Sequence, residues 1–458
     1  MKMIYGVKDK PKFPSILVFA FQQLLAIMAA TIAVPMIVNA ASGSHMSTSA
    51  ALFGAGVGTL VYVAFTRAKS PVFLGSSFAF LGSMMTAFAG AATAALGYFA
   101  LIIGAVMAGL VYVIIALIVK AVGVKWISKI MPAVVIGPTV AIIGLSLAGN
   151  AIGDLGANEA KFAEAKDPVN IYIMIICGLV TLAVTMLCSV YGKKMGKLIP
   201  FIIGILAGYA TASVFYIIGN VSGYEALKVI DYSALTDLFK TVRLESFISL
   251  PDFTFLKAFG SFDKLNASYF STIAVAYIPV AFVVFAEHIA DHKNLSSIIE
   301  HDLLEDPGLS RTLLGDGVGS MVGAFFGGCP NTTYGESVGC VAITKNASVR
   351  TIVVTAIEAM IISFIAPFVA FLSTIPSCVM GGVCIALYGF IAVSGLKMLQ
   401  KVDLDDNRNL FTASVILIAG VGGMVLKFGN VTITEVACAL ILGILTNIML
   451  GRKKKEDK

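Results

Sequence analysis

The sequence predicts an all-α polytopic membrane protein, on the grounds of its apolar content and its long uncharged runs. Of 458 residues, 58% are hydrophobic and only 13% are charged, which is far from the composition of a water-soluble surface. No Asp, Glu, Lys or Arg occurs in residues 13–66, 70–119 or 359–396. Because about 20 helical residues cross a hydrocarbon core about 30 Å thick, each run holds two spans and a turn.

Charged residues and Pro/Gly punctuation divide the chain into fourteen candidate spans. Their centres lie near residues 26, 57, 80, 108, 140, 180, 208, 281, 320, 338, 362, 387, 417 and 443. A polar connection at about residues 220–265 follows the seventh span and suggests two halves of seven. An odd number of spans in each half makes the repeat inverted.

Positive charge tests this topology, because Lys and Arg collect in the short cytoplasmic loops of membrane proteins. With the N-terminus inside, every loop predicted to be inside carries positive residues: 67 and 69, 120–129, 193–197, 293 and 311, 345 and 350, 397–408, and 452–455. The loops predicted to be outside are neutral or acidic, as at residues 39–49 and 154–167. We therefore expect a cell-membrane protein with both termini in the cytoplasm. The net charge of +6 reflects topology and not a nucleic-acid-binding surface.

The third span of each half is interrupted in the same way. Residues 71–78 read Pro-Val-Phe-Leu-Gly-Ser-Ser-Phe, and residues 329–336 read Cys-Pro-Asn-Thr-Thr-Tyr-Gly-Glu. Each stretch is extended, begins at or next to a proline, and ends near a residue that can cap a half-helix. Non-helical backbone inside a membrane is tolerated only where protein or a polar cavity satisfies it, so the two stretches predict a shared polar site.

Five acidic residues fall inside the predicted spans, where ionisable groups are costly and usually functional: Glu287, Asp291, Asp316, Glu336 and Glu358. Glu287 and Asp291 are four apart and share a helix face. Two carboxylates on one face, near a third at a broken helix, suit a proton-coupled site. A carboxylate also accepts the N–H donors of a lactam-type ring.

Structural roles are the alternatives for several of these residues. Asp291 lies near the cytoplasmic end of its span, where water can solvate it, and Asp316 suits a structural hydrogen bond. Glu358 suits a helix or subunit interface. His288 and His292 have no further ligand cluster around them, so no metal site is expected. The seven cysteines show no metal-like spacing and are expected to be small core residues.

At these residues the sequence resembles the nucleobase-ascorbate transporter family, and within it the bacterial uracil permeases. The resemblance runs from about residue 13 to 450 and rests on residues 21–23, 74–80, 286–291, 330–336, and 379–383 with 388–389. It implies a core domain of residues 1–122 and 266–375, holding spans 1–4 and 8–11. The implied gate domain comprises residues 123–265 and 376–458, the latter including a cytoplasmic tail. Short antiparallel strands are implied in spans 3 and 10.

The resemblance also implies how a base is held. Glu287 and Glu336 would hydrogen-bond the base, while backbone groups of Phe78 and Gly335 would hold its remaining edge. Tyr334 and Tyr388 would pack near the ring. Proton coupling would involve Glu287, Asp291 and Glu336. The surrounding residues would be Gln22, Gln23, Ser77, Ser337 and Asp316.

Three departures from the family pattern bear on the substrate. Gln23 replaces a histidine, Ser337 replaces an asparagine, and Asp291 stands where uracil permeases often carry histidine and purine-type relatives often carry aspartate. Uracil imported with a proton is the expected activity, and a xanthine or uric acid permease of the same fold is the alternative. An anion transporter of the related fold is more remote, because buried glutamates disfavour an anion.

Other function classes lack support in the sequence. A membrane enzyme would be expected to show an interfacial nucleophile or a metal cluster, and neither is evident. No cofactor is expected beyond the coupling proton. The expected partners are membrane lipid and, by the resemblance, a second copy of the chain bound through the gate domains.

Overall fold

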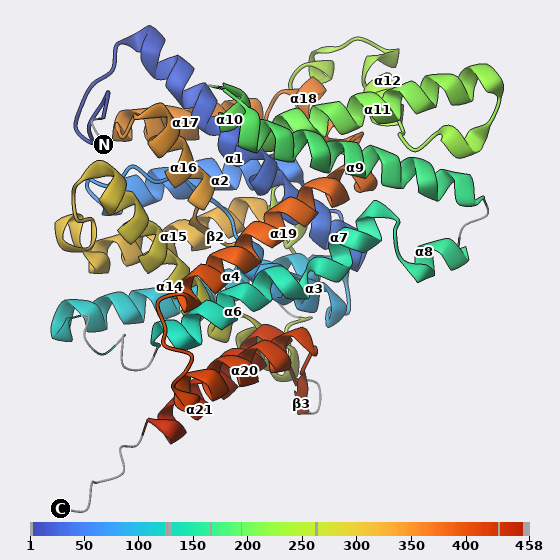
Figure 1. The fold of residues 1–458 in the computed structure, drawn as a ribbon. Coiled ribbons are helices and arrows are strands. Elements are labelled where there is room, and N and C mark those ends of the chain that lie inside the picture. Colours follow the sequence, from blue (N-terminus) through green and yellow to red (C-terminus); the bar gives the residue numbers. More distant parts are fainter. Residues whose placement is uncertain are drawn as a thin grey trace, which may run out of the picture.

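A computed structural model describes residues 3–123, 126, 131–164, 167–193, 195–261, 264–428 and 431–451. The described chain is helical almost throughout (Figure 1). Several residues used in the topology prediction lie outside the described residues: 2, 125, 129, 194 and 452–455.

The first half of the chain contains one short strand and a set of helices. They are α1 (Phe13–Ser42), α2 (Thr48–Phe65), β1 (Leu74–Ser76), η1 (Phe78–Phe80), α3 (Leu81–Ala89), α4 (Ala94–Val122), α6 (Ala133–Ser146), α7 (Ala148–Leu155), α8 (Glu159–Glu164), α9 (Pro168–Tyr191), α10 (Met195–Leu198) and α11 (Pro200–Ser222). The polar connection that follows carries only short helices: η2 (Glu225–Leu227), α12 (Ser233–Lys240), η3 (Leu244–Ser246) and α13 (Thr254–Lys257).

The described residues from 264 onward contain further long helices and three short strands. The elements are α14 (Ala267–Ile299), η5 (Leu304–Gly308), α15 (Leu309–Gly327), β2 (Asn331–Thr333), α16 (Gly335–Thr344), α17 (Val349–Ile362), α18 (Ala366–Ser373), α19 (Ser377–Leu399), α20 (Asn407–Val421), β3 (Leu426–Phe428), β4 (Val431–Ile433) and α21 (Glu435–Leu450). The β3–β4 hairpin was not predicted from the sequence.

The helices have the length and composition of membrane spans. Among the described residues, eight helices are long and apolar enough to cross a membrane, and three shorter apolar helices accompany them. Each predicted span centre falls inside one of the helices. Large apolar side chains on α9 and α11 are exposed, with Leu187 56% and Ile217 60% accessible. Such surfaces suit lipid and not water, and the prediction of a multi-pass membrane protein is confirmed.

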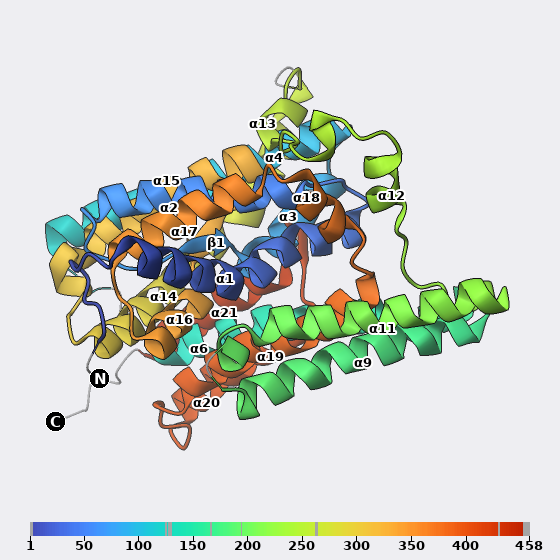
Figure 2. The ribbon, with the colours of Figure 1, turned by 90° about the horizontal axis from the view of Figure 1, so that it is seen from above.

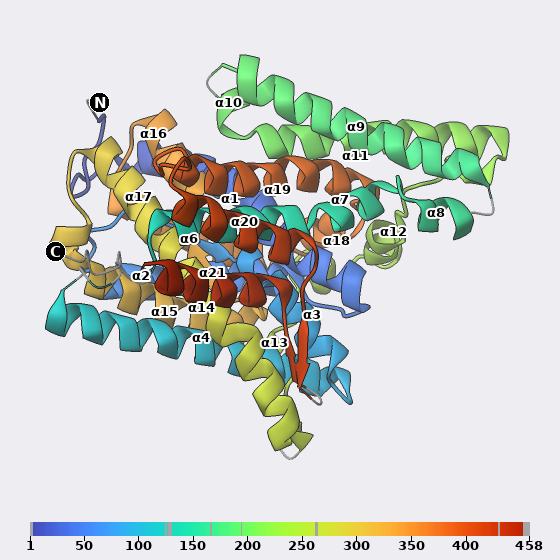
Figure 3. The same cartoon turned by 60° about the horizontal axis from the view of Figure 1, so that its bottom comes forward.

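The long helices pack in two groups. In one, α15 packs against α2 and α4, α14 packs against α4, and α17 packs against α1 and α2. In the other, α19 packs against α6, α7 and α9, and α20 packs against α6 and α21. Figure 2 shows α9 and α11 side by side along one edge of the molecule, and Figure 3 shows α20 and α21 lying together.

Glycines allow the closest helix approaches in both groups. A Cβ atom on Gly54 of α2 would lie 2.4 Å from the carbonyl oxygen of Gly323 on α15. A Cβ atom on Gly382 of α19 would lie 2.2 Å from the carbonyl oxygen of Gly178 on α9. Small residues at helix contacts let the two backbones approach closely. In lipid, where the hydrophobic effect does not drive helices together, the resulting van der Waals packing stabilises their association.

The two broken spans meet as an antiparallel strand pair. Leu74 of β1 lies opposite Thr333 of β2, and Ser76 lies opposite Asn331. Pro71 and Pro330 precede the strands and prevent a continuous helix. Short strands in spans 3 and 10 are therefore confirmed.

The neighbouring helix α2 satisfies polar groups that flank this strand pair. The Leu74 N–H donates to Thr59 Oγ1 at 2.9 Å, and the Asn331 side chain donates to the Gly54 carbonyl oxygen at 3.2 Å. The pairing and these contacts supply the hydrogen bonds that a non-helical segment needs inside a membrane.

The glycine contact between α9 and α19 predicts a stability difference within one helix. Gly382→Ala should lower the free energy of unfolding by about 1–3 kcal/mol, because its methyl group would press on the Gly178 backbone. Gly389→Ala is the control on the same helix, since a Cβ there meets nothing within 4 Å. Thermal unfolding in detergent measures both. Equal melting temperatures for the two variants would show that the close approach is unimportant.

Candidate substrate-binding site

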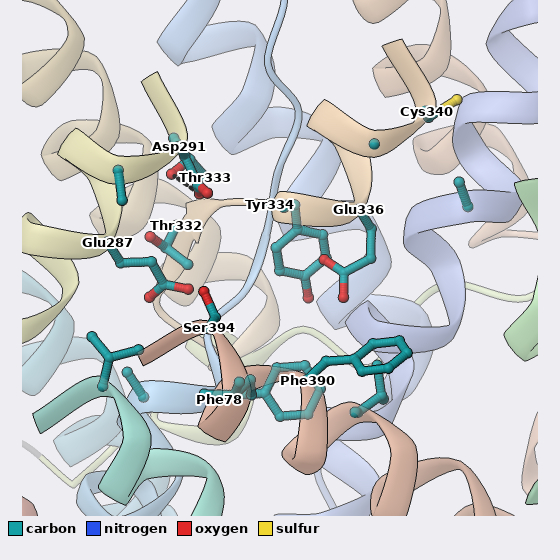
Figure 4. A pocket seen from close by; sticks show the side chains of 18 of the residues that line it. Phe78, Glu287, Asp291, Thr332, Thr333, Tyr334, Glu336, Cys340, Phe390 and Ser394 are labelled. Atoms are coloured by element: carbon teal, nitrogen blue, oxygen red, sulfur yellow. Dashed lines mark hydrogen bonds between the residues drawn. The ribbon is translucent and has the colours of Figure 1, made fainter. Parts of the chain in front are cut away.

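A cavity of about 390 Å³ lies beside the strand pair, which is a suitable size for a small planar ligand. One wall comes from α14, β2 and α16, and the opposite wall comes from α6, α11 and α19. The lining residues used below are Phe78, Lys197, Phe201, Glu287, Asp291, Thr332, Thr333, Tyr334, Gly335, Glu336, Phe390 and Ser394. Figure 4 shows the cavity from close by.

Helix α14 presents two carboxylates to the cavity. Glu287 and Asp291 are one turn apart and both line it. Asp291 Oδ2 accepts a hydrogen bond from Thr333 Oγ1 at 2.9 Å, which joins α14 to β2. The predicted shared face for these two carboxylates is therefore present in the structure.

The two histidines of α14 are buried and do not line the cavity. His288 Nδ1 lies 2.6 Å from Asp316 Oδ2, and His288 Nε2 lies 3.0 Å from Thr312 Oγ1. His292 Nδ1 lies 2.8 Å from the His288 carbonyl oxygen, and its Nε2 lies 2.7 Å from the hydroxyl oxygen of Tyr62. Asp316 thus bonds to α14 from α15 and is turned away from the cavity. No group of three metal-ligating side chains occurs among the described residues.

Helix α16 begins at the cavity and brings Glu336 to it. The helix starts at Gly335, and Glu336 lies in its first turn, where a negative charge is favoured. Tyr334 immediately precedes the helix, and its hydroxyl donates to the Ser76 carbonyl oxygen at 2.7 Å. Gly75 makes room for this ring, because a Cβ there would lie 2.2 Å from it.

Glu287 and Glu336 face a common space from different helices (Figure 4). Neither side chain has a hydrogen bond to the side chain of another described residue. Their oxygens therefore keep acceptor capacity inside a mostly apolar enclosure, and this is costly unless a ligand or a proton uses it. This arrangement can bind a neutral molecule with N–H groups on two edges.

Aromatic rings form the rest of the wall. Phe78, Phe201 and Phe390 line the cavity. Tyr388 is only 2% exposed and packs edge-on against Phe78, with ring centroids 6.1 Å apart. It does not line the cavity, so any influence of Tyr388 on a bound ring would act through Phe78.

Two of the departures from the family pattern contact each other. Gln23 of α1 donates to Ser337 Oγ of α16 at 2.6 Å, and the same Oγ accepts the Phe73 N–H at 3.1 Å. Gln23 and Ser337 are both buried. Ser337 directly follows Glu336, a residue that lines the cavity. The hydrogen bonds of Ser337 therefore connect α1 and the stretch before β1 to the start of α16.

Three other residues singled out from the sequence, Gln22, Ser77 and Glu358, do not line the cavity. Gln22 is half-buried on α1. Ser77 is buried, and its N–H donates to the Pro330 carbonyl oxygen at 2.9 Å. Glu358 lies on α17, away from the lining residues. The seven cysteines form no disulfide; all except Cys188 are buried, and Cys340 lines the cavity.

Sequence reasoning missed several lining residues. Thr332 and Thr333 lay within a recognised block but were given no role. Ser394 is a polar residue in a mostly apolar helix, a signal that could have identified it. Lys197 and Phe390 had no such signal.

Comparisons with known proteins place the whole chain in one group. A permease family model matches residues 14–428. The uracil permease of Bacillus caldolyticus is 38% identical over 100% of this chain and 97% of its own length. The uracil permease of Escherichia coli K12 is 34% identical over 96% of this chain and 92% of its own.

Solved structures share the fold at low identity. The transmembrane domain of a cyanobacterial bicarbonate transporter, BicA, superposes with a TM-score of 0.61 at 14% identity, covering 97% of this chain and 99% of that one. The murine anion transporter Slc26a9 in its inward-facing state gives 0.64 at 12% identity, covering 97% of this chain and 69% of that one.

The family match and the full-length relatives agree with the blocks quoted from the sequence, and the fold is that of membrane transporters. The resemblance noted from the sequence is confirmed: the chain belongs to the nucleobase-ascorbate transporter family and is a permease, not an enzyme.

Proposed function

We propose that this permease imports a nucleobase, namely uracil, together with a proton. The observation that carries the proposal is the pair of carboxylates, Glu287 and Glu336, that face one aromatic-walled cavity and accept no hydrogen bond from the side chain of another described residue. Full-length similarity to uracil permeases supports the choice of base. A purine such as xanthine or uric acid is the second candidate, and Asp291 in place of the histidine frequent in uracil permeases is the observation that favours it.

The chemistry of the site matches both edges of a uracil ring. The ring N–H groups donate to the two carboxylates. The ring carbonyl groups accept from the backbone N–H groups of Phe78 and Gly335, which open helices η1 and α16. The first N–H groups of a helix have no partner inside it, so they are available to a ligand. Three carboxylates around one cavity would repel an anion. This argues against anion transport, the activity named for BicA and Slc26a9.

We propose that the chain works as two bodies related by an inverted repeat of seven spans in each half. The core would comprise residues 1–122 and 266–375, and the gate would comprise residues 123–265 and 376–458. The two groups of packed helices and the symmetric positions of β1 and β2 support this division. The cavity lies between the groups, so motion of one against the other would expose it to either side. Cytoplasmic termini and a dimer through the gate belong to the same proposal.

Proton coupling would offset the free-energy cost of holding charged carboxylates inside the membrane. A proton on Glu287, Asp291 or Glu336 would lower the net charge of the loaded core and so ease its passage through the membrane. Each charge that crosses the membrane potential contributes about 2.3 kcal/mol per 100 mV, which is enough to drive accumulation of a neutral base.

Uptake by proteoliposomes tests the activity and its coupling. Labelled uracil should accumulate above equilibrium only when an inward proton gradient is imposed. Competition by thymine, xanthine, hypoxanthine and uric acid distinguishes the two candidate substrates. Equilibration that is independent of the gradient would contradict symport, and xanthine competing better than uracil would identify the purine candidate as correct.

Glu336→Gln tests the carboxylate contact. The substitution keeps the shape but replaces one acceptor oxygen with a donor, so uracil affinity should fall by about tenfold to a hundredfold. Glu358→Gln is the matched control, because Glu358 is also an acid within a helix but does not line the cavity. Isothermal titration of the purified variants measures both affinities. Normal affinity in Glu336→Gln would remove that residue from the site.

The Gln23–Ser337 contact predicts a non-additive pair of substitutions. Ser337→Ala removes the hydroxyl acceptor at 2.6 Å and leaves the buried Gln23 amide only its longer hydrogen bond, of 3.4 Å, to the carbonyl oxygen of residue 337, so it should cost about 1–3 kcal/mol of stability. Gln23→Leu combined with Ser337→Ala should cost less than the sum of the two single changes. Thermal unfolding measures the cycle. Strict additivity would show that the two side chains are energetically independent.

A further inference from the structure

A second cavity, of about 530 Å³, lies along the same boundary between the two groups of helices. Its walls come from the C-terminal part of α1, the helix α7, the N-terminal part of α9 and the first residue of α19. It shares no lining residue with the central cavity.

The two cavities lie on either side of a buried section of the helices they share. On α1, Ala26 lines the central cavity and Ile37 lines the second one. On α19, Leu387 lines the central cavity and Ser377 lines the second one. The residues of α1 and α19 between these positions are predominantly buried. Passage from one cavity to the other therefore requires the helices to move.

The charge pattern predicts that the second cavity faces the outside of the cell. Asn158 and Lys161, which line it, belong to the loop of residues 154–167 that is predicted to be external. Lys197, at the central cavity, belongs to a loop predicted to be cytoplasmic. The second cavity thus lies where an imported molecule would first meet the protein.

Helix α7 gives this outer cavity two polar side chains, and the charge of Lys161 acts on one of them, Asp154. Asn150 and Asp154 are one turn apart and both line the cavity. Gly149 and Gly153 also line the cavity and, having no side chains, leave space in it. Within the described residues, neither the Asn150 nor the Asp154 side chain has a hydrogen-bond partner. An amide followed by a carboxylate offers one donor group and several acceptors along a single helix face.

Two further amides line the cavity and are partly engaged. Asn158 Oδ1 accepts the Lys161 N–H at 2.9 Å, and Asn170 Nδ2 donates to the Ala226 carbonyl oxygen at 3.0 Å. The Asn158 amide group and the Asn170 oxygen keep their remaining hydrogen-bonding capacity. Together with Asn150 and Asp154 they offer alternating donors and acceptors, as the edge of a lactam-type ring does.

We propose that the outer cavity is a first-contact site that binds the same lactam-type base weakly before the core opens to it. This inference rests on the proposed function. The site would hold the base through Asn150 and Asp154 and would lack the aromatic enclosure of the central cavity. A few hydrogen bonds in open water support a dissociation constant of about 1 mM.

Cysteine protection tests the outer site independently of transport. Ser377→Cys places a thiol at the exposed first residue of α19, and a membrane-impermeant maleimide applied to intact cells should label it. At about 2 mM uracil, twice the proposed dissociation constant, labelling should slow about threefold. Ser373→Cys is the matched control, because Ser373 is exposed but does not line the cavity, and its labelling should not change.

The same measurement in the Glu336→Gln background separates the outer site from the central one. Protection of Ser377→Cys should persist there and should be lost on adding Asn150→Leu or the milder Asp154→Asn. Unchanged labelling up to about 10 mM uracil would overturn the proposal, because this concentration is ten times the proposed dissociation constant and would nearly saturate the site. Protection that needs an intact Glu336 would also overturn it, because the thiol would then report motion caused by central binding. Failure of the proposed function would be seen separately, as absence of uracil binding to the wild-type chain in titration.

Discussion

The structure depends on how backbone polar groups are satisfied where two spans are not helical. Three residues of β1 and three of β2 pair with each other, and α2 supplies further hydrogen bonds to the stretch. Without that pairing, two interrupted spans would each leave unsatisfied N–H and C=O groups inside a membrane protein, at several kcal/mol per group. The pairing has a second effect, since each strand is followed by the start of a helix. Two helix N-termini with free N–H groups are thereby brought to one cavity.

The acidic residues near the strand pair differ in whether another side chain hydrogen-bonds to them. Asp316 is bonded to a buried histidine and Asp291 to Thr333, so these two carboxylates are engaged by the protein. Glu287 and Glu336 have no comparable partner and face the cavity. A site that leaves two acceptors unpaired is poorly stable when empty and improves when a ligand with N–H donors or a proton arrives. Under the proposed function, ligand binding, proton binding and movement of the core would be linked, because each would change the electrostatic cost of these carboxylates.

Much of this arrangement follows from patterns that a single sequence displays. The i,i+4 spacing of Glu287 and Asp291 places them on one face, and Pro330 with Gly335 indicates a broken span ending in a new helix. Patterns in a single sequence do not predict contacts between residues that are far apart in the chain. Gln23 and Ser337 are 314 positions apart, and nothing local indicates that they hydrogen-bond. Tyr388 was expected beside the ligand because of the family resemblance, whereas helix packing buries it against Phe78 and outside the cavity lining. The β3–β4 hairpin was missed because three-residue strands are too short to show a hydrophobic period.

The central claim is that a base donates N–H groups to carboxylates on two different helices. Titration of the purified chain with methylated uracils tests it most directly. We predict that 1-methyluracil and 3-methyluracil, which each lack one ring N–H, bind at least about tenfold more weakly than uracil, consistent with loss of a hydrogen bond to a charged group. Thymine carries its methyl group on carbon and keeps both donors, so it controls for added bulk. Affinities for the two N-methyl compounds equal to that of thymine would contradict the account.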